Sequence, residues 1–214
     1  MKNSFIFSFF LSVVKRSYDV EITENTDWFS NIRQIDEEYH ANVTNNVGSR
    51  ASIQQGKCYL RVIHETFCDN LDLERIEMIR KGIQTGLRTH PLTHSLVITH
   101  SLNYLSHLPP YSGLLHGHYA VIFGIIVKML NISYQMTERI FMRCLVRDLL
   151  SSSYRLNIIG PMEGSKIQNE FIPIIENILQ QYIYKNTLIP IQTSPILEIL
   201  QARHDLLYAR LFNS

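Results

Sequence analysis

The chain has 214 residues, of which 45% are hydrophobic and 18% are charged, and its formal net charge is +1 at pH 7. This length fits a single domain with a sizeable core. The near-zero charge gives no electrostatic basis for binding nucleic acid or a membrane surface, so a partner must be recognised by shape and local chemistry.

The amino-terminal part combines an apolar run with a longer polar segment. Residues 5–14 are apolar and follow Lys2, but this run is too short for a membrane span, which needs about 20 residues. Because no small-x-small cleavage site follows, a buried helix is favoured over the core of a signal peptide. Residues 21–49 are polar and weakly periodic, with a turn expected before Trp28. The acidic run at residues 36–38 is interpreted as a solvated surface.

Two amphipathic helices are predicted next. Apolar residues recur at helical spacing over residues 50–68 and again over 71–83, which indicates helices with one buried face. Gly56 lies on the apolar face of the first helix, where the absence of a Cβ would let another helix approach closely. Residues 84–115 contain prolines and glycines that interrupt any long element, and the best strand-like pattern, at 96–98, is short.

The second half of the chain is predicted to be helical. Residues 118–130 are apolar nearly all round, which is typical of a buried helix. Further helices are predicted at 137–154 and, after a turn at residues 160–164, from about 167 to 182. Pro173 would kink this last helix or mark its first turn. Because strand patterns are scarce, the fold class is predicted to be all-α, as a single-domain helical bundle.

Histidine pairs raise the question of a metal site. His90 and His94 are four residues apart, but Pro91 separates them and no acidic residue follows closely to complete a site. His116 and His118 are two residues apart, so their side chains would diverge in a helix. A role in capping or packing at the helix start is therefore favoured, and no metal ligand is predicted. A metal-dependent enzyme that uses His116 and His118 remains the alternative.

Motifs for catalysis and nucleotide binding are absent from the sequence. There is no GxSxG motif, and each of the three cysteines lies in an apolar helical pattern rather than an electropositive loop. Their odd number and the lack of a CxxC pair favour reduced thiols in a cytoplasmic protein. Residues 160–166 differ from a phosphate loop, because three residues rather than four separate the glycines and Ser precedes Lys. No catalytic residue is predicted, and nucleotide binding by this chain is rejected.

The carboxy-terminal segment carries apolar residues at helical spacing from Pro195 onwards. It ends in Leu211 and Phe212, and Arg210 lies between apolar neighbours. Such a segment is too apolar to remain uncovered, so we expect it to dock on its own domain or on a partner. A helical interaction module with an unrelated partner is therefore a further alternative.

Taken together, three segments of the chain resemble the UreF family of urease accessory proteins. These segments are ASIQQGKCYLR at residues 51–61, GHYAVIFG at 117–124, and the tail that contains His204 and ends in RLFNS at 210–214. The turn at residues 160–164 is also similar to that of the family. The resemblance extends over residues 49–214, and the order and spacing of the motifs make it specific.

The resemblance implies an all-helical homodimer that has no catalytic activity and no cofactor of its own. Members of the family act with a UreD-type scaffold protein, also called UreH, and with the GTPase UreG to deliver nickel, as cargo, into apo-urease. They recruit the GTPase and modulate its nucleotide cycle, and their tail becomes ordered on the scaffold protein. The residues that this implies for partner contact are His204, Tyr208, Arg210, Leu211 and Phe212, and those implied for a structural motif are Gly56, Gly117, His118, Phe123 and Gly124.

The amino-terminal part departs from the family pattern. Members of the family begin with a longer segment that includes a Pro-Gly turn and a Ser-x-Gly-x-Glu sequence, and neither is found here. Residues 1–48 are therefore predicted to be a divergent or truncated amino-terminal segment. Residues 49–214 are predicted to be a UreF-like helical domain with a carboxy-terminal partner-binding tail.

Overall fold

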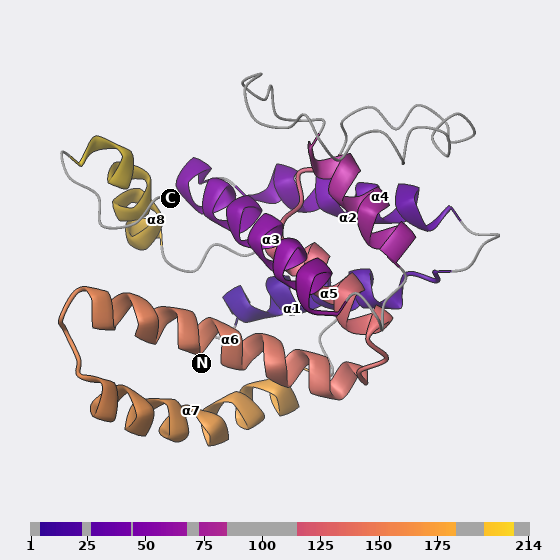
Figure 1. The fold of residues 1–214 in the computed structure, drawn as a ribbon. Helices are drawn as coiled ribbons and strands as arrows, with labels where there is room; N and C mark the ends of the chain where they lie inside the picture. Colours follow the sequence, from indigo (N-terminus) through magenta and orange to yellow (C-terminus); the bar gives the residue numbers. More distant parts are fainter. Residues whose placement is uncertain are drawn as a thin grey trace.

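The computed structural model describes residues 5–22, 27–43, 45–67, 73–84, 115–182 and 195–207, and within these ranges every regular element is a helix (Figure 1). The all-α prediction is therefore confirmed. The elements are α1 (Phe5–Asp19), α2 (Trp28–Asn42), α3 (Asn46–Thr66), α4 (Leu73–Gln84), α5 (Tyr119–Met129), α6 (Tyr134–Arg155), α7 (Pro161–Tyr182), α8 (Pro195–Ala202) and the short 3₁₀ helix η2 (Arg203–Leu206).

Helix α5 lies at the centre of the molecule, packed against α1 and α3 (Figure 1). Every residue from Tyr119 to Val127 is buried, as expected for a helix that is apolar nearly all round. Gly124 allows α1 to approach this helix closely. A Cβ at that position would lie only 2.6 Å from the carbonyl oxygen of Val14 and 2.8 Å from the Cβ of Ser17.

The apolar run near the amino terminus forms α1, and Leu11, Val13 and Val14 in this helix are buried. The interpretation of this run as a buried helix is therefore confirmed. One core draws on residues from both sides of position 48, because α1 and α2 contribute to it together with α3, α4 and α5. The division of the chain at residue 48 stays a prediction.

Helix α2 was not anticipated from the polar segment that contains it. The expected turn before Trp28 is present, since the Asp27 side chain caps the helix by accepting a hydrogen bond of 3.2 Å from the Ser30 N–H. The buried residues of α2 recur on one face, at Trp28, Ile32, Ile35 and Tyr39. The apolar face of α2 is covered by α1 and α5. A weak apolar pattern is therefore enough to place a helix here.

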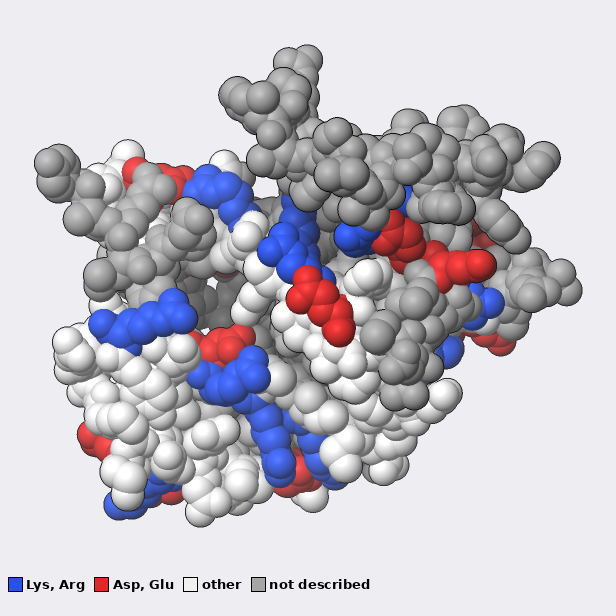
Figure 2. Space-filling model, in the orientation of Figure 1, with Lys and Arg blue, Asp and Glu red and all other residues white. Residues whose placement is uncertain are grey.

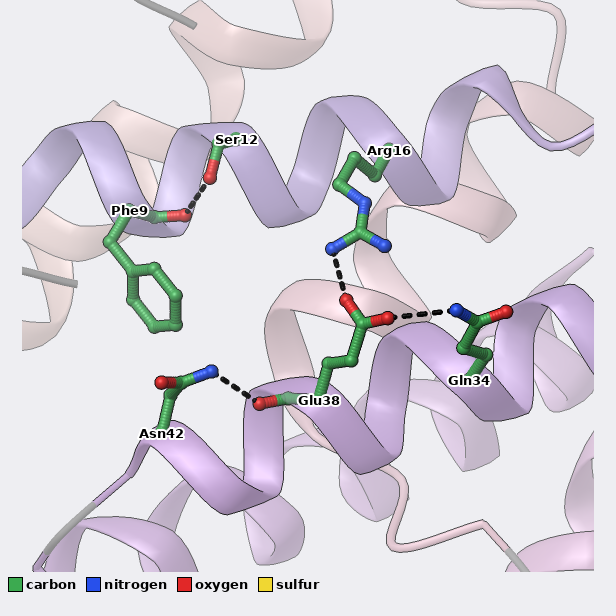
Figure 3. Close-up of polar contacts among 6 residues, drawn as sticks. All are labelled: Phe9, Ser12, Arg16, Gln34, Glu38 and Asn42. Carbon is green, nitrogen blue, oxygen red and sulfur yellow. Dashed lines mark hydrogen bonds and ion pairs between the residues drawn. The ribbon is translucent and has the colours of Figure 1, made fainter. Parts of the chain in front are cut away.

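Polar contacts also connect α1 to α2 (Figure 3). The Arg16 guanidinium donates to the Glu38 carboxylate at 2.6 Å, and Gln34 donates to the other oxygen of the same carboxylate at 2.9 Å. The ring of Phe9 in α1 also stacks on that of Tyr39 in α2, with 5.5 Å between their centroids. The ion pair is partly exposed, so it orients the helices more than it stabilises them.

The helices predicted at residues 50–68, 71–83, 118–130 and 137–154 are present as α3, α4, α5 and α6. Helix α3 begins earlier than predicted because the Asn45 side chain accepts hydrogen bonds from the N–H groups of Val47 and Gly48, at 2.9 and 3.4 Å.

Helix α7 pairs with α6 along one side of the molecule (Figure 1). It begins at Pro161, so Pro173 lies inside the helix and does not mark its first turn. Helix α7 buries Ile175 and Leu179, whereas its large apolar residues Phe171 and Ile174 are 37% and 47% exposed.

None of the helices in the described ranges is both long and apolar enough to cross a membrane.

Candidate functional site

The most connected polar group of the core is Asp36 of α2, whose side chain binds the segment that leads into α5. Its Oδ2 accepts hydrogen bonds from the backbone N–H groups of His116, at 2.6 Å, and Gly117, at 3.0 Å, while its Oδ1 accepts one from His118, at 3.1 Å. These donors lie just before the first turn of α5, where unpaired N–H groups and the helix dipole favour a carboxylate. The carboxylate therefore holds the start of α5 against α2.

The interpretation of residues 36–38 as a solvated acidic surface is wrong for Asp36, which is fully buried. Burial raises the pKa of its carboxyl above the usual range, while the hydrogen bonds from Gly117 and His118 and the nearby His116 act in the opposite direction. Glu37 and Glu38 do lie near the surface, where they pair with arginines.

Three imidazole rings gather beside this carboxylate. The rings of His40 and His116 stack with 3.7 Å between centroids and 8° between planes. Nδ1 of His40 lies 3.0 Å from Nε2 of His118, and Nδ1 of His118 lies 3.2 Å from the Ser52 hydroxyl. Burial and the neighbouring His40 and His116 lower the pKa of His118 to about 3, so its ring is neutral at physiological pH.

The structure brings His116 and His118 close together, but their contacts are those of packing groups. Both ring nitrogens of His118 already face a hydrogen-bonding partner. The lone pairs of His40 and His116 lie in parallel ring planes and do not point at a common centre. Among the residues that the structure describes, no three His, Cys, Asp or Glu side chains are grouped so that they could hold a metal ion.

The residues of the GHYAVIFG segment lie at the junction of α3, α4 and α5. Gly117 has a positive φ of 81°, and a Cβ there would lie 2.7 Å from the side chain of Ile83. His118 is the N-cap residue of α5, and its side chain turns into the core instead of capping the helix.

Gly56 of α3 faces this junction directly. A Cβ at Gly56 would overlap the carbonyl oxygen of Gly117 and would lie 3.1 Å from the Tyr119 nitrogen. The close approach that the sequence predicts at Gly56 is thus made by the chain entering α5. One turn further on, Phe123 is buried against Phe141, with 5.2 Å between ring centroids.

His204 is the predicted partner-contact residue that lies in the described part of the carboxy-terminal segment. It belongs to η2 and is half-buried, and its buried Nδ1 has no hydrogen-bond partner among the residues that the structure describes. The other residues predicted for partner contact lie outside the described residues, and they are Tyr208, Arg210, Leu211 and Phe212. The loop pair His90 and His94 and the strand-like residues 96–98 also lie outside them.

The α8–η2 segment is attached to the start of α3 by polar contacts. Asn45 donates to the backbone carbonyl of Glu198 at 3.1 Å, and Arg50 pairs with Asp205 at 2.6 Å. The four large apolar residues of α8 are between 59% and 74% exposed, and they are Ile196, Leu197, Ile199 and Leu200. An eight-residue helix with this much exposed apolar surface is suited to contact with another protein.

Sequence reasoning missed Asp36, His40 and Ser52, which complete the junction. One signal could have identified Asp36. It lies four residues after Ile32 and three before Tyr39, on the same helical face as these buried residues. An acidic residue inside an apolar stripe indicates a buried carboxylate that needs donors.

The sequence of the chain is similar to one protein family and to several proteins of known name. A family model described as UreF matches residues 8–172, which includes α2 and most of α1. The chain is similar to urease accessory protein F of Arabidopsis thaliana, with 27% identity over 181 residues that make up 85% of this chain and 63% of that protein. It is also similar to urease accessory protein F of Oryza sativa subsp. indica, with 27% identity over 179 residues that make up 84% of this chain and 58% of that protein.

A shorter match is found with urease accessory protein 6 of Cryptococcus neoformans var. grubii. The two chains are 31% identical over 123 residues, which make up 46% of this chain and 39% of the fungal protein. The chain thus spans only about three fifths of the length of the plant proteins that it matches.

Proposed function

Because the chain belongs to the UreF family, we propose that it is an accessory protein of urease maturation that assists nickel insertion without catalysing a reaction itself. The observation that carries the proposal is the family match over residues 8–172, which runs from α1 into α7 and includes the whole junction around Asp36. Relatives from two plants carry the name urease accessory protein F.

The partners that we propose are those of the family: a UreD/UreH-type scaffold protein, the GTPase UreG and apo-urease, with nickel as the cargo of the assembly. A second copy of the chain would complete a homodimer, and the assembly would act in the cytoplasm. The exposed apolar surface of α8 supports a role in binding other proteins, because contiguous apolar patches on a protein surface often mark a site of contact with a partner.

The geometry around His116 and His118 supports a structural role for these residues. The ring nitrogens of His118 face His40 and Ser52, and the ring of His116 stacks on that of His40. A metal-dependent enzyme would need imidazole lone pairs that converge on one ion and leave a coordination position open. The packing of these rings therefore favours the accessory role over the enzymatic alternative.

The proposal is tested by co-expressing the full chain with a urease scaffold protein and its GTPase and purifying the scaffold through an affinity tag. We expect the chain to co-purify with both proteins, and we expect apo-urease incubated with the assembly and nickel to gain activity. Circular dichroism of the isolated chain serves as the control for folding. A folded chain that fails to join the scaffold and the GTPase would contradict the proposal.

A further inference from the structure

A groove of about 1280 Å³ lies between α3, α6 and the α8–η2 segment. Figure 2 shows this face of the molecule hollowed between these elements, with basic side chains at its edge. Pockets for small molecules usually measure about 300–1,000 Å³. The groove is therefore larger than most small ligands require, and its size suits a segment of polypeptide.

One wall of the groove is apolar. Val47 and Ala51 of α3 line it, and Leu200, Leu206 and Leu207 continue this wall on the α8–η2 side. The three leucines are 59%, 78% and 54% exposed, so a ligand could cover most of their surface. Because binding to such a wall removes apolar area from water, the groove is suited to apolar side chains of a partner.

The carboxylates in and beside the groove already have partners. Asp148 accepts a hydrogen bond of 2.8 Å from Gln55 and pairs with Arg147 at 3.2 Å. Asp205 pairs with Arg50 at 2.6 Å. These acidic groups are thus poorly placed to attract a cation from a partner.

The exposed guanidinium of Arg203, by contrast, is available to a partner. Arg203 makes no hydrogen bond or ion pair with any residue in the described ranges. A carboxylate is the acceptor that suits a guanidinium best.

We propose that this groove binds an amphipathic helix of a partner protein that carries carboxylates beside its apolar stripe. The apolar stripe would pack on Leu200, Leu206 and Leu207, and a carboxylate would accept hydrogen bonds from Arg203. Apart from Leu207, the described residues that line the groove belong to helices, and among the described residues there is no strand edge onto which an extended peptide could add. The inference rests on the groove alone and does not require the role in nickel insertion.

The test uses two fluorescein-labelled synthetic peptides and the full chain. Both peptides carry leucines at positions i, i+3, i+4 and i+7 of a helix; one carries glutamates beside this stripe and the other carries lysines in their place. We expect fluorescence anisotropy to show that the acidic peptide binds at least about tenfold more tightly. Equal affinities for the two peptides, or no binding of the acidic one, would overturn the proposal.

Two charge-reversal variants separate the groove from the rest of the surface. Arg203→Glu should weaken binding of the acidic peptide about tenfold and reduce the preference over the lysine peptide. Arg61→Glu makes the same change of charge on the exposed side of α3, outside the groove, and should leave the affinity nearly unchanged. Equal effects of the two variants would show that only the overall charge matters and would contradict the proposal.

Leu206→Asp tests the apolar wall, since this exposed side chain can be replaced without disturbing the core. This substitution should weaken the binding of both peptides. Analytical sedimentation of the chain without peptide tests whether a second copy of the chain occupies the groove. A dimer that dissociates on the substitution Arg203→Glu would assign the groove to that second copy and overturn the proposal.

Discussion

The Oδ2 atom of Asp36 accepts a hydrogen bond of 2.6 Å from the backbone N–H of His116, which lies 80 residues later in the chain. The two residues belong to segments that sequence reasoning kept apart, a polar stretch and the entry to a buried helix. Their contact orients the chain so that Gly117 faces Gly56 and His118 enters the core. The junction that results is the structural setting of the family-like GHYAVIFG segment.

Replacing Asp36 with Asn should destabilise the fold. The amide retains one acceptor oxygen, whereas three N–H groups now share the carboxylate, so at least one buried donor would lose its partner. We expect a loss of about 1–3 kcal/mol in the free energy of unfolding, measured by urea denaturation. Glu37→Gln, on the exposed side of the same helix, is the matched control and should change it by less than about 1 kcal/mol. Equal effects of the two substitutions would show that the contacts of Asp36 contribute nothing.

The stability of the chain should fall as the pH falls below about 6.5, because His118 has a pKa of about 3 in the folded state. Below this pH the unfolded chain binds a proton at His118 that the folded chain does not bind. Each pH unit between 6.5 and 3 therefore lowers the free energy of unfolding by up to about 1.4 kcal/mol. The groups around His118 are His40 and Asp36 from α2, His116 from the entry to α5, Tyr39 and Ser52. Asp36, whose pKa is raised, acts in the opposite direction.

The measurement compares urea denaturation at about pH 7.5 and about pH 5 for the wild type and His118→Asn. Over this interval the free energy of unfolding of the wild type should fall by about 2 kcal/mol more than that of His118→Asn. His64→Asn, in α3 and away from the junction, should keep the wild-type pH dependence. His40→Gln gives a second comparison, since burial also lowers the pKa of His40. If all four proteins show the same pH dependence, the His118 ring does not resist protonation as the structure implies.

Gly56→Ala should destabilise the fold although alanine favours helices. The new methyl group would overlap the Gly117 carbonyl oxygen, a backbone atom that cannot move without displacing the start of α5. We expect a net loss of about 1–3 kcal/mol, larger than the gain of about 1 kcal/mol from helix propensity. Gly160→Ala is the control, because nothing lies within 4 Å of a Cβ at that position. A Gly56→Ala protein as stable as the wild type would contradict the close approach.

Removal of residues 204–214 should abolish formation of the complex with the scaffold protein and leave most of the helical content intact. The deleted segment begins in η2, whose residues contribute no buried side chain, so the core formed by α1 to α7 should persist. Far-ultraviolet circular dichroism and the affinity purification described above give the two readouts. A wholesale loss of helicity would instead make the tail a part of the core.

The helices with a strong apolar period could be predicted from the sequence, whereas the junction at Asp36 could not. Helix α5 is apolar nearly all round and α3 has an apolar face with Gly56 on it, so both follow from local pattern. Helix α2 was missed because charged and polar residues dilute its apolar face. Its burial depends on α1 and α5, which are distant in the chain.

The role of Asp36 was missed for a similar reason. Whether a carboxylate is solvated or buried depends on donors, and these lie 80, 81 and 82 residues away. A local pattern contains no information on such partners. The histidines show the same limit: spacing alone suggested that His116 and His118 diverge, and the ring of His40, from another helix, brings the three together.

The central position of α5 has a consequence for how the chain folds during synthesis. Helix α1 is made well before its partners on α5 and beyond: the Tyr18 hydroxyl donates to the Ile132 carbonyl across 114 residues. Until α5 leaves the ribosome, the apolar faces of α1 to α4 have no central helix to cover them. Contacts of such sequence separation slow folding, and uncovered apolar faces invite aggregation. The chain should therefore be most prone to aggregation in the interval before α5 has been made.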